Sequence, residues 1–192
     1  MGSSDVPRRA SRLLAAVLIT LSLACGGGGG GNEAPTPPPS SGPEGTVVAP
    51  VANEGWIHVA EGSSIVYRSN PPASGPHYPV WLRYEEFATA LPRGYWVHNL
   101  EHGAVVFLYR PDVPAATVDA LRNVFRNLTP DRDCNHRLAV MLPDPALPRP
   151  IAVVAADWLL LADGVHAPTI NDFVAARRNR GPEKICDPGS RP

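Results

Sequence analysis

A proline-rich loop carries the first histidine whose surroundings suggest chemistry. Residues 70–79 read Asn-Pro-Pro-Ala-Ser-Gly-Pro-His-Tyr-Pro, with the histidine at position 77. Each proline fixes φ at about −65°, and Gly75 allows a turn that other residues disfavour. We therefore expect a stiff loop that holds His77 in place as a ligand at little further cost in entropy. The alternative is a turn that packs Tyr78 and Trp81, in which His77 is an ordinary hydrogen-bonding partner.

A second segment places two histidines and a glutamate directly before an apolar run. Residues 97–103 read Val-His-Asn-Leu-Glu-His-Gly. If this segment is helical, His98 and His102 lie on one face, because residues four apart are neighbours on a helix. Imidazole is a common ligand of zinc and copper. We therefore predict a Zn or Cu site formed by His77, His98 and His102. Glu101 would be a fourth ligand, a partner that orients a ligand ring, or a general base.

Two other interpretations of these histidines stay open. In the first, hydrogen bonds alone hold the cluster, which closes the proline-rich loop onto a sheet and binds no metal. In the second, the protein is a metal-dependent hydrolase, because residues 98–102 spell H-x-x-E-H, a signature of zinc proteases. That signature needs a long helix, whereas Pro92 upstream and Gly103 downstream leave room for a short one only. Glu183 is a conceivable third ligand by its position, although no motif surrounds it.

The remaining candidates are isolated residues. Met141 could be a soft copper ligand, although a methionine in an apolar run more often belongs to the core. His58, His136 and His166 have no partner nearby in the sequence. The chain has no glycine-rich phosphate loop after a strand. Its balance of 17 basic and 18 acidic residues gives no electrostatic footprint for nucleic acid.

The start of the chain has the layout of an export signal. In residues 1–24, arginines precede an apolar stretch that is too short to cross about 30 Å of hydrocarbon as a helix. Residues 21–25 read Leu-Ser-Leu-Ala-Cys and resemble a bacterial lipobox, although Ser22 stands where leucine is usual. We predict that cleavage leaves Cys25 as the lipid-bearing first residue, which anchors the protein to a membrane outside the cytoplasm. The alternative is a secreted protein cleaved near Ala24.

The rest of the chain is predicted to divide into a tether and one domain. Residues 25–46 are rich in glycine and then in proline, so we expect a disordered tether. Residues 47–192 are enough for one globular domain with a single core. Cys134 and Cys186 form an even pair outside the reducing cytosol, which predicts a disulfide. The alternative is that both thiolates bind a metal.

The apolar pattern predicts an α+β domain with a mixed or antiparallel sheet backed by two helices. Strands are expected at residues 47–52, 56–59, 104–109, 138–142 and 151–156, with 64–67 as a weaker candidate. Helices are expected at 115–128, where apolar residues recur every three or four positions, and at 169–178. This order is typical of a helix-backed sheet and is compatible with a split βαβ, ferredoxin-like arrangement.

The two histidine-bearing segments together resemble the bacterial domain of unknown function 3105 family. The resemblance rests on residues 70–78, 81, 94–95 and 98–103, on the apolar run that ends at 109, and on 156–158, 173 and 181–183. It covers about residues 55–185, nearly the whole predicted domain. Members are typically tethered to a membrane and extracytoplasmic, so the resemblance implies a location and no reaction. Many relatives carry an N-terminal transmembrane helix, whereas this chain is predicted to be lipidated at Cys25.

These observations lead to one leading hypothesis and two alternatives. The leading hypothesis is an extracytoplasmic lipoprotein whose domain binds Zn or Cu, with a binding or sensing role rather than catalysis. The first alternative is an interaction module of the cell envelope whose histidine cluster is purely structural. The second is a metal-dependent hydrolase, which an open cleft beside the histidines would favour.

Overall fold

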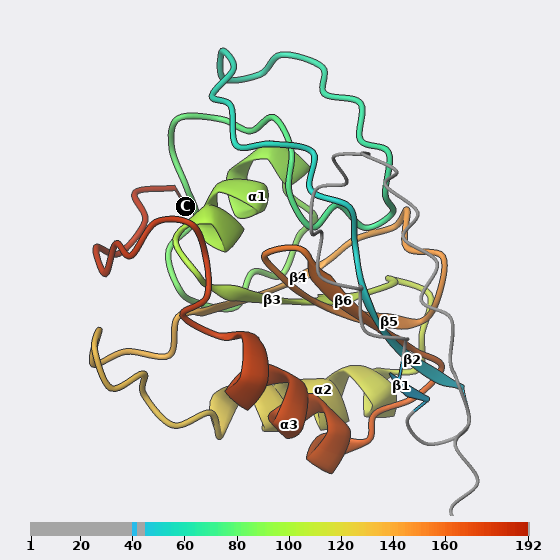
Figure 1. Ribbon diagram of the computed structural model, residues 1–192. Helices are drawn as coiled ribbons and strands as arrows, with labels where there is room; N and C mark the ends of the chain where they lie inside the picture. The colour runs from blue at the N-terminus through green and yellow to red at the C-terminus, as the bar shows by residue number, and fades with distance from the viewer. Residues whose placement is uncertain (1–39, 42–44, 192) are drawn as a thin grey trace, which may run out of the picture. The chain divides into compact units, whose positions relative to one another are not determined.

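The computed structural model describes residues 40–41 and 45–191 (Figure 1). The predicted signal peptide, Cys25 and most of the predicted tether lie outside these residues. In the described part of the chain, a six-stranded mixed sheet carries helices on both faces, which confirms the predicted α+β class. None of the helices described is both long and apolar enough to span a bilayer.

The sheet has the strand order β1-β2-β6-β5-β3-β4. Its strands are β1 (Ser40–Ser41), β2 (Thr46–Pro50), β3 (Val105–Tyr109), β4 (Ala139–Pro143), β5 (Ile151–Ala155) and β6 (Trp158–Ala162). Neighbours are antiparallel except β3 and β4, which are parallel and are connected by α2 (Ala115–Arg126). Strand β1 and the first residue of β2 fall within the segment predicted as a tether.

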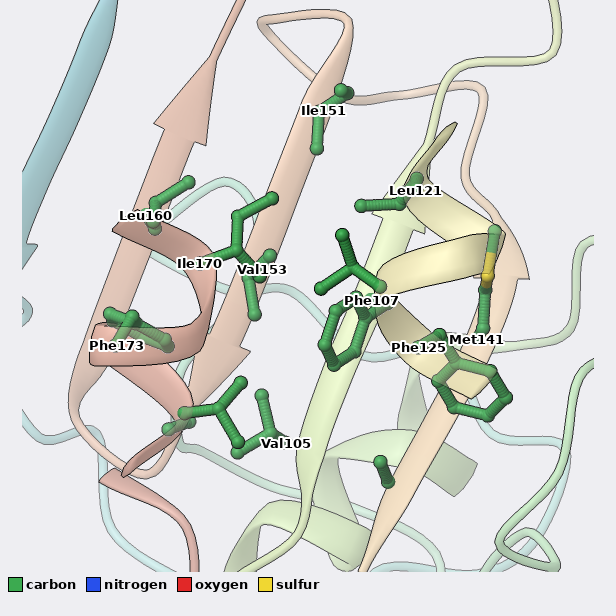
Figure 2. Close-up of a cluster of buried hydrophobic side chains, with 14 of the residues drawn as sticks. Val105, Phe107, Leu121, Phe125, Met141, Ile151, Val153, Leu160, Ile170 and Phe173 are labelled. Atoms are coloured by element: carbon green, nitrogen blue, oxygen red, sulfur yellow. The ribbon is translucent and has the colours of Figure 1, made fainter. Parts of the chain in front are cut away.

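Helices α2 and α3 (Ala167–Arg177) cover one face of the sheet, and α1 (Arg93–Glu101) lies on the other (Figure 1). Leu121 and Phe125 are four residues apart on α2, so both point at the sheet and pack near Phe107 of β3 (Figure 2). Successive side chains of a strand point to opposite faces. Val106 and Leu108 of β3 therefore belong to the second core, under α1.

The second core is covered by α1 and by the irregular segment 51–92. Helix α1 follows Pro92, which takes its N-cap position, and its C-cap His102 is followed by Gly103, whose φ of 81° suits glycine. A Cβ atom at Gly103 would lie 2.9 Å from the Cα of Asn179, so the end of α1 also needs glycine for close packing. Seven of the nine residues of α1 are buried, and three of these are polar or ionisable.

Two predicted strands do not form. Residues 56–59 and 64–67 lie outside the sheet, and His58 makes only an isolated bridge with His77. The backbone of the first segment pairs with the proline-rich loop instead: the N–H of Val59 donates to the carbonyl of His77 at 2.8 Å. Residues 57–59 thus form their backbone hydrogen bonds with the proline-rich loop rather than with a strand of the sheet.

Two elements differ from the prediction in other ways. Strand β6 and helix α1 were not predicted, and β6 forms a tight hairpin with β5 through Asp157, whose φ is 59°. The split βαβ, ferredoxin-like arrangement does not form, because β3 and β4 pair directly and no strand lies between them.

The predicted disulfide between Cys134 and Cys186 is present, with the two Cα atoms 5.0 Å apart. It connects the segment before β4 to the C-terminal segment.

Candidate metal centre

Three chain segments converge on the histidines next to α1. The proline-rich loop lies between the segment around His58 and the helix, and backbone hydrogen bonds fix it on both sides. On one side, the N–H of His77 donates to the carbonyl of Ile57 at 2.9 Å. On the other side, the N–H of Tyr78 donates to the carbonyl of Gly94 at 3.1 Å. These bonds bring histidines from distant parts of the sequence to one face of α1.

The carboxylate of Glu101 lies at the centre of this cluster. Its Oε2 atom is 3.0 Å from Nε2 of His77, 3.6 Å from Nε2 of His58 and 3.7 Å from Nε2 of His98. One ligand atom from each of the four residues lies within 4.8 Å of the others. Zinc–nitrogen bonds of 2.0–2.1 Å in a tetrahedron place ligand atoms about 3.3 Å apart. The distances from Glu101 bracket that value, so the four residues could hold a metal ion once the rings adjust around it.

Backbone carbonyls determine which ring nitrogen carries the hydrogen in His77 and in His98. Nδ1 of His77 is 2.8 Å from the carbonyl of Gly75, and Nδ1 of His98 is 2.6 Å from the carbonyl of Tyr78. A carbonyl only accepts hydrogen bonds, so each Nδ1 carries a hydrogen and donates it. In a neutral ring this leaves the lone pair on Nε2, directed into the cluster. Metal-binding histidines commonly have the same arrangement.

The lone pair of His77 faces a carboxylate, which is unfavourable without a positive charge between them. Either a proton lies between Nε2 of His77 and the carboxylate, or a cation binds to both groups. Glu101 is only 5% exposed, and within the part of the chain that the structure describes its ion-pair partners are all histidines. A buried carboxylate needs a compensating charge. This cluster therefore requires either protons or a metal.

Burial keeps one of the rings in the form that binds metals. His77 and His98 are 0% and 2% exposed. Burial lowers the pKa of His98 to about 3, and the neighbouring histidines reinforce that direction. His98 is therefore neutral at pH 7, which is the protonation state that a metal ligand needs. The side chain of His58 is 52% exposed, so the cluster reaches solvent on that side.

His102 occupies a neighbouring position rather than the one predicted for it. Its Nε2 atom is 3.1 Å from Nε2 of His98, which confirms that the two rings share a face of α1. However, His102 belongs to a second group of potential ligands, with Glu101 and Glu183. Burial also lowers the pKa of His102. The predicted set of four is thus only partly brought together, and His58 stands where His102 was expected.

Aromatic side chains cover the cluster on two sides. The ring of Trp81 lies 4.8 Å from that of His98 and 4.4 Å from that of His102, and Trp56 meets the edge of His77 at 6.1 Å. A cavity of about 480 Å³ lies elsewhere in the described chain, beside Asp131 and Arg178.

The other candidate residues have structural roles. Met141 is fully buried in the core under α2 and α3, on the opposite face of the sheet from α1 (Figure 2). The ring of His136 bonds the carbonyl of Cys186 at 2.6 Å, and His166 caps α3.

Comparison with known proteins assigns this domain to a family. Residues 58–188 match the model of a family described as "Protein of unknown function (DUF3105)". The chain is a member of the DUF3105 family. The matched region begins at His58 and includes every residue of both ligand groups, so the cluster lies within the DUF3105 domain. No curated protein and no solved structure matches the chain.

Sequence analysis missed His58 as a member of the cluster for a physical reason. Its neighbours in sequence contain no other ligand, and it reaches the cluster only through backbone pairing of residues 57–59 with His77. Such pairing is not local, so no spacing pattern in the DUF3105 sequence reveals it. Glu183 was considered from its position alone, and the structure places its carboxylate 3.4 Å from Nε2 of His102.

Proposed function

We propose that this DUF3105 domain binds one zinc or copper ion in a buried His/Glu cluster. The ligands would be His58, His77, His98 and Glu101. The observation that carries the proposal is the convergence of three Nε2 atoms on one carboxylate oxygen that has no lysine or arginine partner among the described residues. Two of the rings are already oriented by backbone carbonyls, which reduces the entropy lost when a metal binds.

The donor atoms favour a divalent ion. Imidazole and carboxylate suit Zn²⁺ and Cu²⁺, whereas Cu⁺ prefers thiolate and thioether ligands. The sulfur atoms of the described chain are not available to this cluster. Met141 packs on the opposite face of the sheet, and Cys134 and Cys186 are bonded to each other.

The ligand set favours binding or sensing over catalysis. Four protein ligands fill a tetrahedral shell, as they do in structural zinc sites, whereas catalytic sites keep one position open. The half-exposed ring of His58 gives the ion a route to and from solvent. We place this function outside the cytoplasm, on a lipoprotein anchored to the cell envelope through Cys25. The disulfide between Cys134 and Cys186 is in keeping with an oxidising compartment.

The competing interpretation is a purely structural cluster. The distance of 3.0 Å between His77 and Glu101 is also that of a hydrogen bond between an imidazolium and a carboxylate. The domain would then serve as an interaction module of the envelope, and the cluster would contribute to stability without metal. The two interpretations differ in what happens when His58 is removed, because its exposed ring contributes little to a structural cluster.

The test compares metal content in His58→Ala and in a matched control. The mature chain would be exported, purified in detergent and examined by elemental analysis and by Zn²⁺ and Cu²⁺ titration. We expect at least one metal ion per parent chain, and at least tenfold weaker binding at this cluster in His58→Ala. His166→Asn removes an imidazole outside the cluster and keeps a helix-capping side chain, so its metal content should not change. A parent protein without metal, whose melting temperature does not respond to either ion, would overturn the proposal.

A further inference from the structure

We propose that a second divalent metal ion binds beside the first, held by Glu101, His102 and Glu183. This inference rests on the proposed function, because the second position shares Glu101 with the first. The ligand atoms of these three residues lie within 4.8 Å of one another. A carboxylate that belongs to both groups is suited to bridge two metal ions, as in sites where two metals act together.

The buried ring of His102 has partners for one of its two nitrogen atoms only. It is 2% exposed, and its Nδ1 atom has no hydrogen-bond partner. Its Nε2 atom faces Nε2 of His98 at 3.1 Å and a carboxylate oxygen of Glu183 at 3.4 Å. The carbonyl of Tyr78 holds the proton of His98 on Nδ1, so that ring offers a lone pair. When the first ion takes that lone pair, Nε2 of His102 has no acceptor in His98, and a second cation would bind to Nε2 of His102 and to the carboxylate of Glu183.

Backbone hydrogen bonds and close packing hold the segment that carries Glu183 against α1. The N–H of Glu183 donates to the carbonyl of Glu101 at 3.0 Å, and the N–H of Asn179 donates to the carbonyl of Gly103 at 2.8 Å. Between them, Gly181 lies so close to α1 that a Cβ atom would be 2.3 Å from the carbonyl oxygen of Glu101. The C-terminal segment therefore lies along the end of α1, as Figure 1 shows.

The second position differs from the first in access and charge. The side chain of Glu183 is 50% exposed, and three protein ligands leave a tetrahedral ion one open position. Glu101 and Glu183 together carry two negative charges, so two divalent ions would leave the centre with a net positive charge. Water or an oxyanion such as phosphate is the class of ligand that would fill the open position. The first ion would thus be enclosed, and the second would face solvent.

The experiment is a Zn²⁺ titration of the mature chain in detergent, followed by calorimetry. We expect two ions per chain, with the second bound more weakly than the first. Glu183→Gln keeps the size of an exposed side chain and removes its charge, so it should fold normally. It should lower the stoichiometry from two ions to one and leave the first affinity within a few-fold of the parent value. Glu85→Gln, an exposed carboxylate outside the cluster, is the control and should keep two ions.

The outcomes separate this inference from the proposed function. A parent chain that binds one ion, with the same affinity in Glu183→Gln, overturns the second position and leaves the first intact. Retention of two ions in Glu183→Gln also overturns it, because the second ion would then lie elsewhere. Binding of no ion by the parent overturns both proposals together.

Discussion

The substitution Glu101→Gln distinguishes a metal-binding cluster from a hydrogen-bonded one. Glutamine keeps the size of the side chain and removes the charge that faces His58, His77 and His98. If the cluster is a buried ion pair between His77 and Glu101, the loss of one partner costs about 3–5 kcal/mol, with or without metal. If the cluster binds metal, metal affinity is lost as well, so the loss of stability is larger when metal is present.

The expected magnitude in the metal-bound case follows from mass action. Zn²⁺ at about 1,000 times its dissociation constant stabilises the parent by about 4 kcal/mol. A roughly hundredfold weaker site in Glu101→Gln would retain about 1.4 kcal/mol at the same Zn²⁺ concentration. For a domain of this size, 1 kcal/mol corresponds to about 2–4 °C in melting temperature. Zn²⁺ should therefore raise the melting temperature of the parent by about 8–16 °C and that of the variant by about 3–6 °C.

The assay is thermal unfolding of the parent and Glu101→Gln in EDTA and in Zn²⁺. We expect the difference in melting temperature between the two proteins to be larger in Zn²⁺ than in EDTA, by about 5–10 °C. An equal loss of stability in both solutions would refute metal binding as the role of this carboxylate. A parent chain whose melting temperature ignores Zn²⁺ would refute it as well.

Two further predictions concern the disulfide and the buried rings. Replacing Cys134 and Cys186 together by serine removes a cross-link between residues 52 apart in the sequence. The chain-entropy model predicts that the free energy of unfolding falls by about 4 kcal/mol. Denaturant unfolding would measure this loss, and an unchanged midpoint would contradict the prediction. In EDTA, the unfolded chain binds a proton at His98 near pH 6.5, whereas burial lowers the folded pKa to about 3. Stability should therefore fall as the pH drops from about 6.5 toward 3, and His98→Asn should weaken this dependence if it folds.

The sequence predicts the parts of the fold that rest on local patterns. The apolar run at 104–109 and the amphipathic stretch at 115–128 appear as β3 and α2 at nearly the expected positions. The helix buries one face and the strand buries both faces, and each kind of burial leaves its own pattern of apolar residues in the sequence. Each pattern can therefore be recognised without knowing which elements pack beside it.

Helix α1 could not be predicted in the same way. Its buried residues surround the helix and include His98, Asn99 and Glu101, so it lacks an apolar stripe with polar residues opposite. The side chain of Asn99 explains part of this pattern, because its amide bonds both the N–H and the carbonyl of Leu82. These polar residues are buried because they form specific hydrogen bonds. A prediction from the spacing of apolar residues cannot detect such burial.

The candidate site shows the same division between local and non-local information. The four-residue spacing of His98 and His102 correctly predicts neighbouring rings. The addition of His58 and the placement of Glu183 depend on backbone pairing between segments far apart in the chain. The sequence therefore indicates which residue types are present at the cluster, whereas the division into two ligand groups emerges only from the fold.

The most direct test of metal binding is a crystal structure of the zinc-loaded chain with anomalous diffraction at the zinc edge. We predict an anomalous peak about 2.0–2.1 Å from Nε2 of His58, His77 and His98, with an oxygen of Glu101 at a similar distance. Well-ordered rings around Glu101 without a peak, in crystals that contain zinc, would contradict the proposal and identify the cluster as hydrogen-bonded scaffold.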